Sequence, residues 1–151
     1  MNKSNKLSWL VSIPIVLLVL SLIIFNKSST SNKEQYSHFV KSIEYVNRAN
    51  DQLNNRVSSQ GFYNIINREE EVGRISYFKK AISETTYVDA QKLNDVYEGF
   101  GSHYRDEFVK GLTFIIEGFE NNDTQKFIDG QLLLNQWGSW YEQNINEIGK
   151  K

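Results

Sequence analysis

Residues 119–127 read FENNDTQKF, a polar turn between two long amphipathic stretches. Its four central residues are of types that favour turns and helix N-caps: Asn121, Asn122, Asp123 and Thr124. Before the turn, apolar residues recur on one helical face: Leu93, Val96, Phe100, Tyr104, Phe108, Leu112, Ile115 and Phe119. After it, the stripe continues with Phe127, Leu134, Trp137, Tyr141, Ile145 and Ile148. This stretch therefore predicts an antiparallel hairpin of two helices.

Aromatic residues are concentrated towards the open end of this hairpin. Of the 44 hydrophobic residues after Phe25, 18 are Phe, Tyr or Trp. Tyr104 and Trp140 are equidistant from Asn122 along the chain, so the groups around them should meet: Tyr97, Phe100, Tyr104 with Trp137, Trp140, Tyr141. Two interpretations stay open. The groups form either a closed core or a groove whose rings hold a ligand or a partner's side chain, with His103 and Arg105 at its rim.

A first helix of the domain should precede this hairpin. Ser31 and Glu34 fit a capping box at its start. Seven residues then follow at alternating spacings of three and four, as in a bundle or coiled coil: Tyr36, Phe39, Ile43, Val46, Asn50, Leu53 and Val57. We expect a helix over about 32–59, with a break at Gly61.

The second helix should start between Phe62 and Arg68 and end near Ile82. Thr86 with Asp89 fits a cap for the long third helix, which can bend near its glycines, Gly99 and Gly101. No proline follows Pro14, so nothing after it prevents long helices. No run of strictly alternating apolar and polar residues indicates a sheet. The chain is therefore expected to be all-α, with an antiparallel bundle of about four helices over 33–151.

The 19 residues from Leu7 to Phe25 hold 15 of the 60 hydrophobic residues and no charge. A helix of that length spans roughly 28 Å, close to the ~30 Å hydrocarbon core of a bilayer. We expect a transmembrane signal-anchor over 7–25, a short cytoplasmic tail over 1–6 and a flexible tether over 26–32. A cleaved signal peptide is the alternative, with the domain then secreted. Both interpretations place residues 33–151 outside the cytoplasm.

Charge and composition exclude several kinds of function. After Phe25 the chain has 15 basic and 18 acidic residues, a formal charge of −3, without a basic cluster. Nucleic-acid binding needs such a cluster to displace counterions from phosphates, so DNA and RNA are not expected partners. The absence of cysteine excludes disulfides, thiolate zinc sites and cysteine nucleophiles.

We expect no metal, cofactor or catalytic site. The two histidines pair with glutamates at a spacing of four, Glu34 with His38 and His103 with Glu107, whereas a carboxylate-bridged metal centre uses a spacing of three. Ordinary polar pairs on solvated faces are the simpler interpretation. A solvated acidic first turn is likewise expected for three consecutive glutamates: Glu69, Glu70 and Glu71.

A short basic tail, one span and a helical exterior give a layout that resembles small bacterial envelope and cell-division proteins. The leading hypothesis is a non-enzymatic, membrane-anchored module that binds another envelope protein. The alternative is a sensor-like bundle that captures a small molecule or glycan in an aromatic groove, and an envelope enzyme ranks third. An exposed seam on the first domain helix, with Asn50 in it, would instead indicate a homodimer through that helix.

Overall fold

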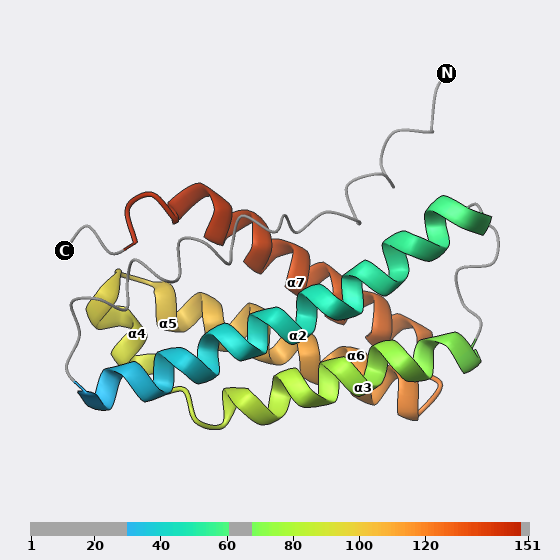
Figure 1. Cartoon of the computed structure of the whole chain (residues 1–151), viewed down its shortest axis with the longest axis horizontal. Coiled ribbons are helices and arrows are strands. Elements are labelled where there is room, and N and C mark those ends of the chain that lie inside the picture. The colour runs from blue at the N-terminus through green and yellow to red at the C-terminus, as the bar shows by residue number, and fades with distance from the viewer. Residues whose placement is uncertain (1–29, 61–67, 149–151) are drawn as a thin grey trace, which may run out of the picture.

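The computed structural model describes residues 30–60 and 68–148, and these residues form helices and turns without a strand (Figure 1). The elements in chain order are α2 (Thr30–Gln60), α3 (Arg68–Thr85), α4 (Ala90–Val96), α5 (Phe100–His103), the π-helix η4 (Tyr104–Val109), α6 (Lys110–Glu120) and α7 (Thr124–Asn144). The all-α prediction is confirmed for this part of the chain.

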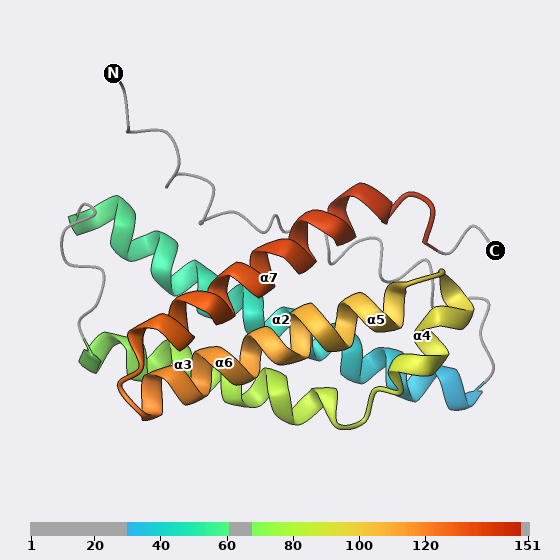
Figure 2. The ribbon, with the colours of Figure 1, turned by 180° about the vertical axis from the view of Figure 1, so that it is seen from behind.

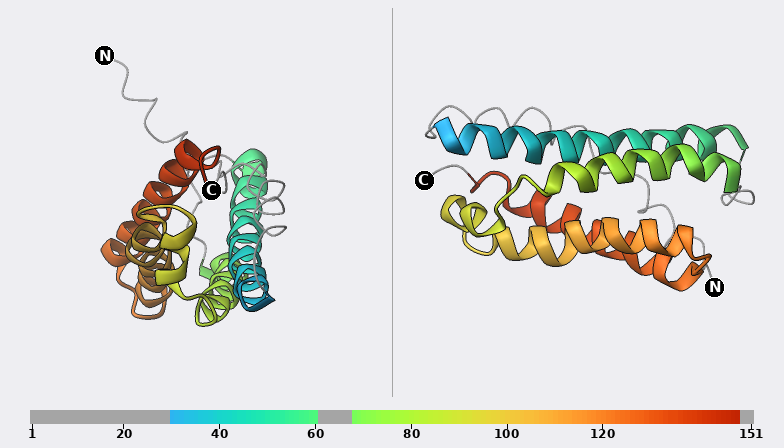
Figure 3. Two further views of the ribbon diagram at one scale, coloured as in Figure 1. Left: turned by 90° about the vertical axis from the view of Figure 1, so that its left-hand side faces the viewer. Right: turned by 90° about the horizontal axis from the view of Figure 1, so that it is seen from below.

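Two helical hairpins form the two layers of the bundle. Helices α2 and α3 form one layer, and α7 lies beside α6 in the other, as the right-hand view of Figure 3 shows. The continuous rod of α5, η4 and α6 runs the length of the second layer, which is in front in Figure 2. Contacts between α3 and α6 join the layers.

The boundaries of the first two helices agree with the sequence prediction. Helix α2 covers the expected 32–59 and begins two residues earlier, at Thr30, so the expected tether is helical from that residue. Helix α3 begins at Arg68, at the end of the expected interval, and continues past Ile82 to Thr85. Residues 61–67, including the expected break at Gly61, lie outside the described part of the chain.

The expected cap at Thr86 is wrong. The Thr86 hydroxyl donates to the Ser83 carbonyl oxygen at 2.8 Å, back into the end of α3. Asp89 is the N-cap, and its carboxylate accepts from the Gln91 N–H at 2.9 Å. Helix α4 therefore starts at Ala90, after a turn that closes α3.

The long third helix is broken where only a bend was expected. Gly99 adopts a left-handed conformation with φ of +81°, which ends the path of α4 and starts α5 in a new direction. A Cβ at Gly101 would overlap the carbonyl oxygen of Ala90, so the two short helices pack backbone to backbone. The side chain of Asn94 stabilises this corner, because its Oδ1 accepts from the Gly101 N–H at 2.7 Å.

The turn at 121–123 has the expected form. Asn122 has a positive φ of 55°, a conformation that asparagine tolerates better than most residues. Asp123 caps α7 and accepts from the Lys126 N–H at 2.9 Å. Gly130 then lets α7 approach α6 closely, since a Cβ there would lie 2.6 Å from the Ile115 nitrogen.

None of the described helices is both long and apolar enough to cross a bilayer. The expected span at 7–25 and the tail at 1–6 lie outside the described residues, as do residues 26–29 of the expected tether.

Candidate functional site

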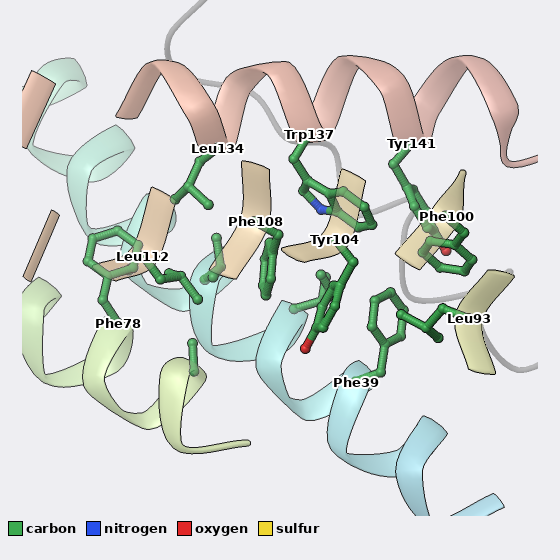
Figure 4. Close-up of a cluster of buried hydrophobic side chains, with 14 of the residues drawn as sticks. Phe39, Phe78, Leu93, Phe100, Tyr104, Phe108, Leu112, Leu134, Trp137 and Tyr141 are labelled. Carbon is green, nitrogen blue, oxygen red and sulfur yellow. The ribbon is translucent and has the colours of Figure 1, made fainter. Parts of the chain in front are cut away.

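The two predicted aromatic groups meet in the centre of the bundle. Trp137 of α7 stacks on Phe100 of α5, with ring centroids 5.8 Å apart, and meets Tyr104 edge-on at 5.9 Å. Phe39 of α2 closes the cluster from the other layer, 5.5 Å from Tyr104, and Tyr141 lies 5.4 Å from Trp137 (Figure 4). The antiparallel register expected from Asn122 is therefore confirmed.

Four of the eight candidate residues are core residues. Phe100, Tyr104, Trp137 and Tyr141 are each no more than 2% exposed. Their rings touch one another and Phe39, so they contribute packing energy and contact no ligand while the bundle stays closed. An open groove walled by all eight residues does not agree with this burial.

A local π-helix explains how the aromatic stripe stays buried. Phe100, Tyr104, Phe108 and Leu112 are spaced four residues apart, and in an α-helix each such step drifts by about 40° around the axis. The wider turn of η4 takes up this drift, and all four side chains reach the core. Three successive spacings of four residues between buried side chains are the sequence signal that could have indicated this π-helix.

Burial changes the acidity of two of these rings. Burial raises the pKa of Tyr141 to about 12 and raises the pKa of Tyr104 further, with its hydroxyl facing Ser42 of α2. Both phenols therefore stay protonated in the folded protein at neutral pH.

Three other candidate residues form a half-buried edge of the cluster. The ring of His103 lies on that of Trp140, with centroids 4.3 Å apart, and Tyr97 lies 6.1 Å from Trp140. The Tyr97 hydroxyl donates to Asn144 Oδ1 at 2.9 Å, and Asn144 Nδ2 donates to the Trp140 carbonyl oxygen at 2.7 Å. His103 Nδ1 bonds Glu107 Oε1 at 2.9 Å. We call Tyr97, His103 and Trp140 the Trp140 rim.

Arg105, the last candidate, lies in solvent. Its guanidinium bonds the neighbouring Asp106 carboxylate at 2.9 and 3.0 Å, and both side chains are more than 60% exposed. The guanidinium holds the pKa of Asp106 below its usual value. An exposed pair of this kind contributes little to stability.

A second aromatic–histidine cluster was not predicted from the sequence. His38 of α2 bonds Glu84 of α3 at 2.6 Å, so the expected pairing of His38 with Glu34 is wrong. The ring of Tyr87 stacks on His38 with centroids 4.4 Å apart, although the Tyr87 side chain is 63% exposed. We call His38, Glu84 and Tyr87 the Tyr87 platform. Antiparallel packing of α2 and α3 creates it, and no local spacing reveals it.

The expected solvated acidic turn is wrong for Glu71. Glu71 is 2% exposed and pairs with Arg74, itself 3% exposed, at 2.8 Å. Arg74 also donates from Nε to the Ala49 carbonyl oxygen at 3.2 Å, which ties α3 to α2. The side chains of Glu69 and Glu70 lie outside the described residues.

In the part of the chain that the structure describes, no three His, Asp or Glu side chains are grouped so that they could hold a metal ion. The seam of the first domain helix faces inward from Tyr36 to Val46, with Asn50 half-buried. This stretch of α2 therefore packs within the bundle, and the side chains of the later seam residues, Leu53 and Val57, lie outside the described part of the chain.

Comparison with known proteins does not assign the chain to a family. No protein-family model matches it, and no curated protein or solved structure matches it significantly.

Proposed function

We propose that the protein is a non-enzymatic, single-pass membrane protein whose extracytoplasmic bundle binds another protein of the cell envelope. The observation that carries the proposal is the Tyr87 platform. The alternative, a ligand-binding aromatic groove, is less favoured, because Phe100, Tyr104 and Trp137 would form its central wall and are buried in the core. Recognition then depends on what the bundle presents at its surface.

Tyr87 has the properties of an anchor residue in a protein interface. It is the most exposed of the large apolar side chains in the described part of the chain, at 63%. Its position is set before any partner binds: His38 supports its ring, and its N–H donates to the Glu84 carbonyl oxygen at 3.2 Å. Tyrosine is enriched among residues that dominate binding energy, and an anchor that is already ordered loses little entropy on binding.

The platform lies near the end of the bundle that leads towards the expected span. His38 is eight residues after Thr30, so it lies about 12 Å along α2 from the helix start. The four residues between the span and α2 reach at most ~14 Å. Tyr87 would therefore be presented close to the membrane surface. The partner we propose is an envelope protein that offers, near the membrane, an apolar pocket for the ring and a polar group for its hydroxyl.

Crosslinking in native membranes tests the proposal. Full-length wild type, Tyr87→Ala and Val72→Ala are crosslinked and their partners identified by mass spectrometry. Val72 is a matched control because it is 57% exposed on α3, far along that helix from Tyr87. We expect one envelope protein with wild type and Val72→Ala and its loss with Tyr87→Ala. Recovery of the protein alone, or equal recovery with Tyr87→Ala, would contradict the proposal.

The second candidate function is capture of a small molecule or glycan at the Trp140 rim. The observation that favours it is the half-buried Trp140 ring stacked on His103, because exposed indole faces bind sugar rings and flat ligands. Titration of Trp140→Phe and wild type with candidate glycans, followed by tryptophan fluorescence, separates the two functions. A saturable change in wild type that is lost in Trp140→Phe would favour ligand capture over protein binding.

A further inference from the structure

The outward surface of α7 has no charged side chain over three turns. Residues 130–141 read GQLLLNQWGSWY, about 17 Å of helix. The exposed surfaces of the other long helices carry charges at comparable positions, among them Lys41 on α2, Lys79 on α3 and Lys110 on α6. Depletion of charge is the compositional signal of the centre of a protein interface.

This surface also carries an apolar and polar seam at coiled-coil spacing. Ile128, Leu132, Asn135 and Ser139 follow one another at steps of four, three and four residues, opposite the buried stripe that contains Leu134, Trp137 and Tyr141. Ile128 and Leu132 are 42% and 50% exposed. Steps of three and four keep side chains on one line along a helix, which suits packing against a second helix.

The polar groups of this surface have no partner in the described part of the chain. Four side chains form no hydrogen bond or ion pair there: Gln131, Asn135, Gln136 and Ser139. At the two ends of the helix, by contrast, Gln125 bonds Asp129 and Asn144 bonds the Trp140 carbonyl oxygen. The amides of Gln131, Asn135 and Gln136 can therefore each act as both donor and acceptor towards a partner.

We infer that this surface of α7, centred on Leu132 and Asn135, is a homotypic interface that binds the same surface of a second copy of the chain. In a two-fold symmetric contact, residues near the axis meet their own copies, so any charge there meets a like charge. A surface without charge avoids that repulsion. Asparagine suits the axis, because its amide both donates to and accepts from an identical amide.

The interface is small, and association through it is weak in solution. Two faces of three turns bury less area than a standard protein interface. Confinement of two copies in one membrane raises their effective concentration and compensates for this. The inference rests on the membrane anchor of the proposed function, but it needs neither the Tyr87 platform nor an envelope partner.

Cysteine crosslinking of the full chain in membranes tests the inference. The chain has no native cysteine, so a disulfide between copies can form only through an introduced residue. Asn135→Cys should form an intermolecular disulfide under mild oxidation, whereas Lys41→Cys on the outer surface of α2 should not. Adding Leu132→Lys to Asn135→Cys places like charges at the axis and should lower the disulfide yield about ten-fold or more. Val72→Lys in the same background is the control and should leave the yield unchanged.

Two results would overturn the inference. One is a disulfide yield at position 135 no higher than at position 41. The other is a yield at 135 that Leu132→Lys does not change more than Val72→Lys, since the copies would then meet through another part of the chain. A circular dichroism spectrum identical to wild type for Leu132→Lys shows that the lost yield reports the interface, because Leu132 is half exposed and outside the core.

Discussion

The imidazole of His103 lies nearly parallel to the indole of Trp140, with ring centroids 4.3 Å apart and an angle of 17° between the planes. Three residues earlier, Trp137 is enclosed by Phe100, Tyr104 and Tyr141 and is 2% exposed. The two tryptophans of α7 therefore have different roles. Trp137 holds the layers together, and Trp140 forms the edge of the cluster.

Truncation should separate these roles. Trp137→Ala leaves a large cavity between the layers and should lower the free energy of unfolding by about 3–5 kcal/mol. Trp140→Ala removes a ring that is already partly in water and should cost about 1–2 kcal/mol. Urea unfolding of the full chain in mild detergent, followed by circular dichroism, measures both. Equal losses would mean that the two rings are buried alike.

The buried pair of Glu71 and Arg74 predicts a double-mutant effect. Removing one partner leaves a charge in the interface between α2 and α3, so Glu71→Leu should cost about 3–5 kcal/mol. Replacing both residues, with Glu71→Leu and Arg74→Met together, should cost less than that single change. The comparison uses unfolding free energies of the two single variants and the double variant. Additive losses would show that the two side chains do not act as a pair.

Two glycines should respond to alanine in opposite directions. Gly130→Ala places a Cβ 2.6 Å from the Ile115 nitrogen and 2.7 Å from the Gly111 carbonyl oxygen, so α6 and α7 must separate, at a cost of about 1–3 kcal/mol. Gly73 is exposed on α3, and its nearest neighbour would be the flexible end of Gln52 at 3.3 Å. Gly73→Ala should therefore raise the free energy of unfolding by up to about 1 kcal/mol, because alanine favours the helix more than glycine does. Thermal unfolding of both variants checks the sign of each change.

Alkaline pH should destabilise the fold through its buried phenols. The pKa of Tyr141 rises from 10.0 in the unfolded chain to about 12 in the folded protein, and that of Tyr104 rises further, both through burial. Below about pH 10 both phenols are protonated in the folded and in the unfolded state, so their ionisation does not lower the free energy of unfolding. Between about pH 10 and the folded pKa, the unfolded chain releases protons that the folded chain retains, so the free energy of unfolding falls as pH rises.

Urea unfolding between pH 8 and 11.5 measures this dependence, with absorbance at 295 nm reporting phenolate formation. Tyr141→Phe should flatten the alkaline decline relative to wild type, because it removes one of the protons concerned. An identical decline in wild type and Tyr141→Phe would show that Tyr141 titrates normally in the fold.

Local patterns predicted α2, α3, α7 and the register of the second hairpin, but neither the break at Gly99 nor the π-helix η4. The turn at Asn121 to Asp123 and the helical spacing on either side of it specify the hairpin. Equal chain distances of Tyr104 and Trp140 from Asn122 bring the two aromatic groups together, with Tyr104 against Trp137. Such features depend on neighbours a few residues apart, which sequence periodicity reports directly.

The features that sequence did not predict depend on contacts between distant residues. His38 bonds Glu84 across two helices, 46 residues away, so local spacing led to Glu34 instead. Glu71 is buried because α2 covers the first turns of α3, although a run of three glutamates is typical of a solvated helix start. The division of the candidate aromatic residues between core and rim likewise depends on which face of α7 the other layer covers.

The most direct test of the account is photo-crosslinking from position 87 in living cells. A photoreactive phenylalanine analogue replaces Tyr87 in one variant of the full chain and Val72 in another, since both side chains are exposed. The account predicts one discrete protein adduct from position 87 and none from position 72. Adducts with lipid alone at position 87, or the same protein adducts from both positions, would contradict the proposal that the Tyr87 platform docks an envelope protein.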